Sequence, residues 1–494
     1  MDVSSALGYN SAMAYKNLQD FISDLEKNNE LTRITAKVDS NLEITEITDR
    51  ISKDHGPALL FENVKGSEYP VLINAFGSYK RMAMALGAKT IEEKAAEMDE
   101  LIEWGFSQMR KLDVLSFFPK MKWARLFLPH KVNNAPCQQI IDHDPDLGKL
   151  PVLTCWPGDG GPFFTLPMVI TKDPESGAQN MGMYRMQVFD KNTTGMHWHL
   201  HKDGAHFYQK YKDRGERMPV AVALGGDPAV TYSATAPLPE GISELFFAGY
   251  LRGKPVETVQ CITNDLEVPA QAEFIIEGYV DPSEPLRNEG PFGDHTGYYS
   301  LTGDYPVFHV TCITHRKNPV YPATIVGQPP MEDCYMAKAT ERLFLPLLKK
   351  MVPEIVDLNL PLEGVFHNCA VISIQKRYAG HVHKVLNALW GLGQMMYTKM
   401  IIVLDHDVDI QNMSVVMWKV FNNIDASRDL IMSEGPLDAL DHASPRPRFG
   451  TRLGIDATRK GILDGHEREW PEDITMSSDM IDQVTRRWKE FGLD

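Results

Sequence analysis

Two consecutive prolines, Pro329-Pro330, divide the chain into parts with different patterns of apolar residues. From about residue 125 up to them, short apolar runs are separated by Gly, Pro, Asn and Asp, which is typical of short strands in a barrel or a sandwich with insertions. Directly after them, Met331–Met351 has helical spacing that is interrupted by Pro346. Since proline cannot continue a regular element, the sequence predicts a β-rich domain, a connecting helix and a further domain.

The remaining regular elements are predicted from the spacing of apolar residues. After the connecting helix, Val371–Ile374 and Met400–Leu404 have strand length and flank the helix-like His381–Met396, so a βαβ unit with parallel strands is expected. Near the end, Asp479–Phe491 is an amphipathic helix expected to dock on its own domain or on a neighbouring subunit. The other predicted helices lie at Leu18–Leu25, Tyr79–Met98 and Asp99–Met109, and the other strands at Ile34–Val38, Leu166–Thr171, Val220–Leu224, Phe274–Val280 and Val307–Thr314.

Composition limits the classes of protein that this chain can belong to. Its 494 residues are 43% hydrophobic and 23% charged, as in a globular protein of two or three domains. The start lacks the pattern of a signal peptide and no apolar run has the length of a membrane span, so a cytoplasmic protein is expected. The net charge of −16 argues against a nucleic-acid partner, and the six cysteines form no CxxC pair.

The segment Glu289–Tyr299 has the composition of a chemical site. Three glycines and a proline favour a turn that can approach a ligand closely, while Glu289 and Asp294 place two carboxylates five positions apart. An ordinary surface turn explains the Gly and Pro equally well. A fixed positive charge, Arg185, lies near the end of the alternating segment Asn180–Gln187. It is either a surface residue or a partner of these two acids. Such a group would hold one carboxylate ionised and raise the pKa of the other.

Three histidines, His197, His199 and His201, alternate in a segment that is expected to be a strand. A strand would place them on one face, which suggests a zinc site. At about 3.3 Å per residue, however, the outer two would lie roughly 13 Å apart, so at most two neighbours could share an ion. A polar strand face that meets solvent is the alternative.

Taken together, these segments resemble the UbiD-type decarboxylases, which use prenylated flavin mononucleotide (prenylated FMN). The resemblance covers nearly the whole chain. Its most specific parts are Asn180–Gln187, Met196–Gly204, Asn264–Ala270 with Ile276–Gly278, Glu289–Tyr299 and Tyr378–His381.

The resemblance implies a mixed α/β protein. Residues 1–125 form an N-terminal α/β segment, 126–330 a split-barrel domain for the flavin, 331–352 a linker helix, 353–470 an α/β oligomerisation domain and 471–494 a helix that packs across subunits. It also implies a homo-oligomer, either a dimer or a hexamer, and a flavin prenyltransferase as the supplier of the cofactor.

The resemblance further implies roles for individual residues. The catalytic group is Arg185, Glu289 and Asp294, with Asp294 as the proton donor. The metal ligands are Asn180, His201 and Glu244; oxygen ligands with one imidazole suit Mn²⁺, and K⁺ is a second candidate ion. The flavin contacts are Met183, Tyr184, Arg185, His197, Trp198, His199, Lys202, Asp203 and Lys384, of which His197, His199 and Asp203 depart from the pattern of the family.

The implied reaction is the reversible, non-oxidative decarboxylation of an aromatic acid. The cofactor is needed because no side chain can absorb the charge that is left on an sp² carbon. Asp rather than Glu at position 294 resembles the pattern of the hydroxyarene branch of the family. The substrate that this implies is a 4-hydroxy-3-polyprenylbenzoate or a naphthoate of quinone biosynthesis. A polyprenylated substrate would bring the protein to a membrane surface. A metal-dependent hydrolase that uses His197–His201 and a non-catalytic flavin-binding subunit are the alternatives.

Overall fold

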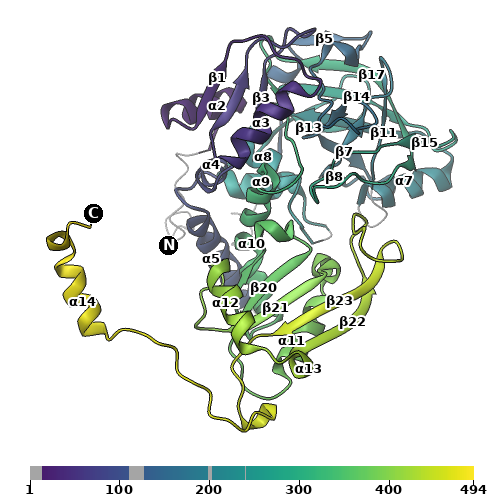
Figure 1. Ribbon diagram of the computed structural model, residues 1–494. Helices are drawn as coiled ribbons and strands as arrows, with labels where there is room; N and C mark the ends of the chain where they lie inside the picture. Colours follow the sequence, from purple (N-terminus) through teal and green to yellow (C-terminus); the bar gives the residue numbers. More distant parts are fainter. Residues whose placement is uncertain (1–13, 111–126, 199–202, 240, 494) are drawn as a thin grey trace.

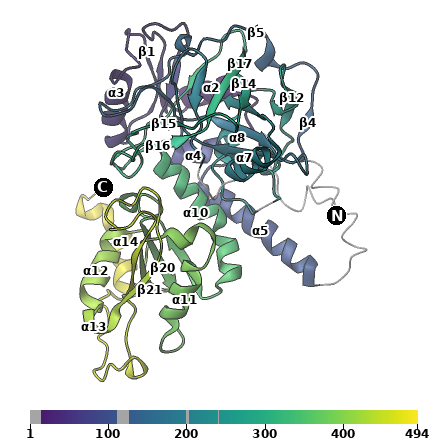
Figure 2. The ribbon, with the colours of Figure 1, turned by 90° about the vertical axis from the view of Figure 1, so that its right-hand side faces the viewer.

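The computed structural model describes residues 14–110, 127–198, 203–239 and 241–493. Figure 1 shows an upper body made of the N-terminal and β-rich parts and a lower body made of the C-terminal part. Helix α10 (Glu332–Met351) lies between them and packs against α5 (Ile91–Arg110) in both views (Figures 1 and 2). The helix continues through Pro346, so the predicted interruption is wrong; one proline removes a single backbone donor without ending this helix.

The first elements form a small layer on the upper body. Helix α2 (Leu18–Lys27) begins where the Asn17 side chain accepts a hydrogen bond from Asp20 N, and it buries the apolar face that its spacing predicted. The sheet beside it has the order β1-β2-β3-β18. The strand predicted at residues 34–38 is displaced, because β1 ends at Ile34. The bounds in this layer are β1 Leu31–Ile34, α3 Glu43–Lys53, β2 Ala58–Phe61, β3 Val71–Ile73 and β18 Tyr321–Pro322.

One predicted helix is divided in two. The spacing predicted a helix over Tyr79–Met98, but α4 (Tyr79–Ala85) ends before Gly87 and α5 begins only at Ile91. Gly87 adopts a left-handed φ of 70°, and Thr90 Oγ1 accepts a hydrogen bond from Glu93 N at 3.1 Å. A glycine stop followed by a threonine cap outweighs the apolar spacing, and the second helix then runs through the boundary that was predicted at residue 98.

A seven-stranded antiparallel sheet forms the centre of the upper body, in the order β10-β17-β14-β11-β7-β8 with β5 also pairing β17. The four strands predicted in this region are confirmed. Among the described residues the hydrogen-bonded path stops at β8 and β10, so the sheet is open, as in a split barrel. The bounds are β5 Ile140–Asp142, β7 Met168–Lys172, β8 Gln179–Met183, β10 Thr193–Gly195, β11 Met218–Leu224, β14 Phe274–Val280 and β17 Val307–His315.

Both faces of this sheet are covered, which makes it the core of the upper body. On β14, Phe274 and Ile276 belong to one buried cluster and Ile275 to another, as expected when alternate side chains point to opposite faces. The elements that cover and extend the sheet are β4 His130–Lys131, β6 Phe163–Phe164, β9 Met186–Gln187, α7 Asp203–Arg214, α8 Pro228–Ser233, α9 Glu244–Arg252, β12 Glu257–Gln260, β13 Glu267–Pro269, β15 Arg287–Glu289 and β16 Gly303–Tyr305.

The lower body is a five-stranded sheet with the order β19-β20-β21-β23-β22. Strands β20 and β21 are parallel and are joined through α11, so the predicted βαβ unit is confirmed. Buried clusters lie on both faces of the sheet. The bounds are β19 Ile355–Asn359, β20 Cys369–Ile374, α11 His381–Trp390, β21 Met400–Asp405, α12 Met413–Asn423, α13 Ala426–Asp429, β22 Leu430–Pro436 and β23 Phe449–Asp456.

The last helix, α14 (Ser478–Arg486), lies apart from both bodies at the end of an extended segment in Figure 1. None of its residues is buried. Of all the helices in the described part of the chain, none has the length and apolar character needed to cross a membrane.

Candidate active site

Arg185 joins the two acids of the Glu289–Tyr299 turn. It lies between β8 and β9, and its Nε is 3.0 Å from Oε1 of Glu289, the last residue of β15. Its Nη1 donates to Oδ2 of Asp294, and its Nη2 donates to Ser300 Oγ at 3.1 Å. Arg185 and Asp294 are nearly buried and Glu289 is fully buried, so the guanidinium neutralises charges that water does not reach. Two segments more than 100 positions apart therefore meet as an ion network.

Each carboxylate of the network also has its own imidazole. His197 Nδ1 lies 3.0 Å from Glu289 Oε2, and His295 Nδ1 lies 2.9 Å from Asp294 Oδ1. Burial acts to raise the pKa of both acids, but the hydrogen bonds from these imidazoles and the charge of Arg185 hold both pKa values below their usual range. The expectation that the network raises one pKa while lowering the other is therefore wrong, because each acid has its own stabilising donors.

Hydrogen bonds from neighbouring segments fix the turn that presents Asp294. Gln187 Oε1 accepts from Gly290 N at 2.8 Å, and Asp159 Oδ1 accepts from Gly293 N at 2.7 Å. Gly290 has a φ of 94°, a conformation that other residues rarely adopt, so glycine is required at this position. The turn is therefore held by side chains from two other segments in addition to its own backbone hydrogen bonds, such as that from Asp294 N to Tyr298 O.

Asp294 lies on the wall of a cavity of about 260 Å³. This volume is close to the lower end of small-molecule sites, roughly 300 Å³. Arg185 and Glu289 are not among the residues of the wall, so Asp294 is the member of the ion network that a molecule in this cavity can contact. The lining residues are Asp49, Lys53, Trp156, Gly293, Asp294, Gly297, Tyr298, Tyr299, Gly327 and Gln328.

The predicted flavin contacts fall into three groups. Tyr184 and Trp198 lie in one buried cluster of the upper body, and Met183 packs against the clusters next to it. Trp198 Nε1 is a buried donor that has no hydrogen-bond partner among the residues that the structure describes. Lys384 lies instead on α11 of the lower body, where its Nζ is 2.5 Å from Glu354 Oε1. His199 and Lys202 lie outside the described residues, and Asp203 begins α7.

The expected histidine strand is wrong where the structure describes it. Strand β10 ends at Gly195, and Trp198 N then donates to Met196 O at 2.9 Å, which is a tight turn. A strand cannot contain such a local hydrogen bond, so His197 is turned toward Glu289 rather than placed on an alternating face with its neighbours.

Two of the predicted metal ligands lie next to each other. Asn180 Nδ2 donates to Oε1 of Glu244 at 3.0 Å, and Met181 N donates to Oε2 of Glu244 at 3.1 Å. The third, His201, lies outside the described residues; within those residues no cluster of three His, Cys, Asp or Glu side chains is present. An amide and a carboxylate are the oxygen donors that Mn²⁺ or Mg²⁺ prefers, so the residues fit a hard cation.

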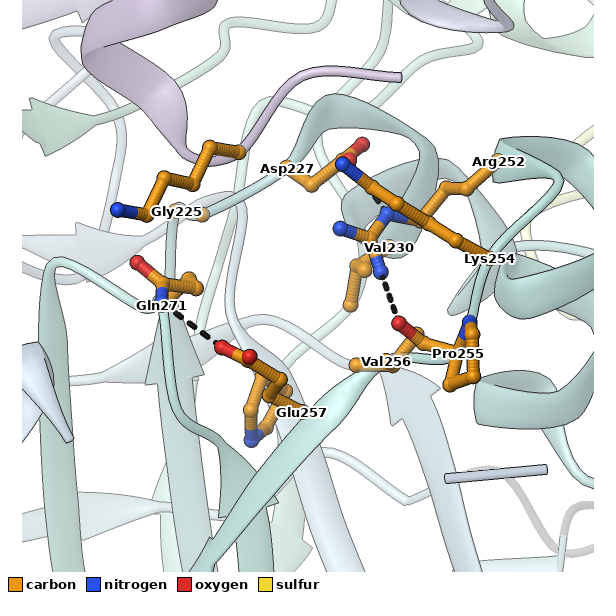
Figure 3. A pocket seen from close by; sticks show the side chains of 12 residues that line it. Gly225, Asp227, Val230, Arg252, Lys254, Pro255, Val256, Glu257 and Gln271 are labelled. Carbon is orange, nitrogen blue, oxygen red and sulfur yellow. Dashed lines mark hydrogen bonds and ion pairs between the residues drawn. The ribbon is translucent and has the colours of Figure 1, made fainter. Parts of the chain in front are cut away.

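A second cavity, of about 130 Å³, shares no residue with the first (Figure 3). Its main charged feature is an ion pair in which Arg252 Nε lies 2.5 Å from Asp227 Oδ2, and Arg252 Nη1 also donates to Pro255 O. Lys254 extends across the pair in Figure 3. The other charged residues on its wall are Lys16 and Glu257, and the Arg252 guanidinium is already neutralised by Asp227.

Sequence reasoning missed several residues next to the site, among them His367. Its Nε2 lies 2.7 Å from Nε2 of His295, although the two residues are 72 positions apart. Nothing in the local pattern around His367 indicates this contact, since it depends on how the two bodies meet.

Family models match three parts of the chain. Residues 130–329 match the 3-octaprenyl-4-hydroxybenzoate carboxy-lyase Rift-related domain (UbiD), residues 22–103 the N-terminal domain and residues 334–457 the C-terminal domain of the same family. An uncharacterized protein of Archaeoglobus fulgidus is 49% identical over 481 residues, which cover 97% of this chain and 99% of the relative. An uncharacterized protein of Aquifex aeolicus is 48% identical over 490 residues, with coverage of 97% and 99%.

Solved structures of similar proteins agree with the fold. The vanillic acid decarboxylase of Sedimentibacter hydroxybenzoicus in its closed form superposes with a TM-score of 0.84 at 28% identity, covering 98% of this chain and 100% of that chain. HmfF of Pelotomaculum thermopropionicum, a UbiD-class enzyme in complex with FMN, gives a TM-score of 0.79 at 29% identity, with coverage of 95% and 98%. An evolved dimeric form of HmfF in complex with prenylated FMN gives 0.79 at 28% identity, with coverage of 96% and 100%. The chain therefore belongs to the UbiD family of carboxy-lyases.

Proposed function

We propose that this protein catalyses the prenylated-FMN-dependent, non-oxidative decarboxylation of a hydroxyarene carboxylic acid in the cytoplasm. The observation that carries the proposal is the buried ion network of Arg185, Glu289 and Asp294, of which Asp294 lines the cavity of about 260 Å³. The likeness to the vanillic acid decarboxylase and to HmfF with prenylated FMN supports the substrate class and the cofactor.

The division of labour follows from what a decarboxylation needs. When bound, prenylated FMN supplies the electron sink for the carbon that loses CO₂. Glu289 is buried behind Arg185 and fixes the guanidinium, and Arg185 in turn fixes Asp294 at the cavity wall. Once it has received a proton, Asp294 delivers it to the carbon, which is the task of a general acid. The same residues would serve the reverse reaction, a carboxylation, so the proposed reaction is reversible.

We assign the remaining roles on the same basis. The buried indole N–H of Trp198 is a donor with no partner among the described residues and can serve the flavin, beside Met183, Tyr184, Arg185 and His197. His199, Lys202 and Asp203 complete the proposed flavin contacts. Asn180, Glu244 and His201 would hold Mn²⁺, which would allow a chain of net charge −16 to retain a phosphate group. Lys384 would have to give up its ion pair with Glu354 to contact the flavin.

The proposed substrate is a 4-hydroxy-3-polyprenylbenzoate, and a naphthoate of menaquinone formation is the rival within the same reaction class. A flavin prenyltransferase would supply the cofactor. We further propose a homo-oligomer, for which the separate position of α14 leaves an apolar helix face available.

The test is to purify the protein after co-production with a flavin prenyltransferase and to offer it a panel of aromatic acids. We expect a flavin-like absorbance, stoichiometric manganese and release of CO₂ from hydroxyarene acids. Zinc without flavin would point to a hydrolase instead. Bound flavin without turnover of any acid would contradict the proposal and favour a non-catalytic flavin-binding subunit.

A further inference from the structure

A pair of histidines crosses the junction between the two bodies directly behind Asp294. His295 Nδ1 lies 2.9 Å from Asp294 Oδ1, and its Nε2 lies 2.7 Å from Nε2 of His367, which is located just before β20 in the lower body. All three side chains are largely shielded from water. The candidate proton donor of the upper body is therefore connected to the lower body by one imidazole.

The two contacts of His295 limit where its protons can lie. Only one proton can lie between the two Nε2 atoms, and Nδ1 of His295 must carry a proton because it faces a carboxylate. Burial acts to lower the pKa of His295, but the hydrogen bond and charge of Asp294 raise it above its usual value. Burial and the nearby charge of His295 lower the pKa of His367 to about 4. These opposite shifts favour a positive charge on His295, which would then donate from both nitrogens, with His367 neutral and accepting at Nε2.

The backbone just before His367 has an unusual conformation beside the contact between His295 and His367. Val365 and Phe366 have φ values of 41° and 51°, and left-handed backbone is rare for non-glycine residues, above all for a β-branched one. This conformation stacks the Phe366 ring on His295, with centroids 4.7 Å apart and planes 24° apart. Unfavourable backbone that persists beside a reacting group is a sign of a functional constraint.

We propose that the proton used in each turnover is stored on His295 and that His367 holds it there when the lower body is docked. This inference rests on the proposed function of Asp294. In each cycle the Nδ1 proton of His295 moves to Asp294, Asp294 passes one proton to the carbon that has lost CO₂, and neutral His295 is recharged from water. One proton is consumed per CO₂ and no electron is transferred. His295 and His367 are positioning residues, because neither lines the cavity beside Asp294.

Three acidic groups near His295 favour its charged form. Asp294 accepts its proton directly, Asp333 contributes from the first turn of α10, and Asp438 contributes from the segment between β22 and β23. Arg185, which also binds Asp294, is paired with both acids of the network. Because His367, Phe366 and Asp438 all come from the lower body, the proton store depends on the contact between the bodies.

The inference is tested on the full-length protein without cofactor, with ring-labelled histidine followed by NMR as a function of pH. The His295 resonance is assigned by its loss in His295→Asn. Replacing His367 by Leu removes the acceptor, so we expect the pKa of His295 to fall by about one to two units, the shift that a hydrogen bond to a charged group implies. His367→Gln keeps an acceptor oxygen and should shift it by less than about half a unit. An unchanged pKa in His367→Leu, with the fold intact by circular dichroism, would overturn the inference.

The loaded enzyme provides a second readout. Since the charged form of His295 is required, activity is present below its pKa and is lost as pH rises through it. His367→Leu should therefore move the alkaline limb of the pH profile downward by the same shift as in NMR, and His367→Gln should not. A limb that stays in place in His367→Leu would overturn the storage role. Absence of turnover in the wild-type enzyme would overturn the proposed function instead, while the NMR result would still decide whether the pair exists.

Discussion

His197 Nδ1 lies 3.0 Å from Oε2 of Glu289, whose other oxygen lies 3.0 Å from Arg185 Nε. Burial lowers the pKa of His197, so the ring donates as a neutral imidazole. The fully buried Glu289 is thus an ionised anchor with donors on both oxygens, and Arg185 is held in place from behind. In this arrangement Nη1 of Arg185 donates to Asp294. The long side chain of Arg185 is therefore fixed at one end by Glu289 and can position the proton donor.

Replacing Arg185 by Met should destabilise the protein strongly at neutral pH. It would leave Glu289 and Asp294 buried near each other without their shared cation, and breaking a buried pair in this way costs about 3–5 kcal/mol. Both acids have lowered pKa values in the folded state, so their pairing stabilises above the usual carboxyl pKa and is lost as pH falls through the folded values. Urea unfolding at pH 7 and at about pH 4 should show a smaller difference from wild type at the lower pH.

The double variant Arg185→Met/Glu289→Gln is the control for this prediction. It removes one of the two uncompensated charges and should recover part of the lost stability. A penalty for Arg185→Met that is equally large at both pH values, or is not reduced in the double variant, would show that lost packing rather than charge is responsible.

Gly160→Ala should disturb the turn that carries Asp294. A Cβ at Gly160 would lie 2.2 Å from the carbonyl oxygen of Gly290, and backbone at this position cannot move cheaply. We expect a loss of about 1–3 kcal/mol in stability together with reduced turnover. Gly461→Ala is the matched control, because its Cβ would meet no atom within 4 Å. Thermal unfolding and turnover of both variants check this, and equal behaviour would contradict the account.

Local patterns in the sequence predicted those parts of the fold that depend on local residues. The apolar spacing of α2 and the strands β11, β14 and β17 follow from periodicity, which neighbouring residues determine. The turn at Trp198 was missed because one backbone hydrogen bond to Met196 overrides the alternating pattern.

The candidate site shows the same limit. A cationic residue and two acids in the chain suggested the ion network, since a buried guanidinium needs carboxylates. The pair of imidazoles and the lowered pKa of both acids were not predicted. They depend on His197 and His295, the imidazoles beside Glu289 and Asp294. The contact of His197 with Glu289 and that of His295 with His367 are set by the packing of the sheet and of the two bodies rather than by spacing.

Glu244→Ala should remove the proposed metal. Glu244 lies beside Asn180, and loss of a carboxylate ligand is expected to lower the bound manganese by about tenfold or more. Metal analysis of purified protein measures this directly. Glu257→Ala, which changes an exposed carboxylate on β12, should keep the wild-type content. Equal manganese in the two variants would remove Glu244 from the proposed ligand set.

Deleting residues 471–494 should reduce the assembly to a smaller oligomer. Helix α14 and the residues after it expose Met480, Trp488 and Phe491 to between 42% and 47%, an apolar face that we propose packs on a neighbouring subunit. Light scattering after gel filtration gives the mass. Met480→Glu/Trp488→Glu should act like the deletion and Lys489→Gln should not. An unchanged mass in the truncated protein would refute this packing.

The most direct test of the central claim is the turnover of Asp294→Asn, loaded with prenylated FMN, against Asp49→Asn, which makes the same change on the same cavity wall. We expect Asp294→Asn to retain the flavin absorbance but to lose about 10²–10⁴-fold in CO₂ release, the usual contribution of a general acid. Asp49→Asn should stay within a few-fold of wild type. Turnover of Asp294→Asn at the wild-type rate would contradict the account.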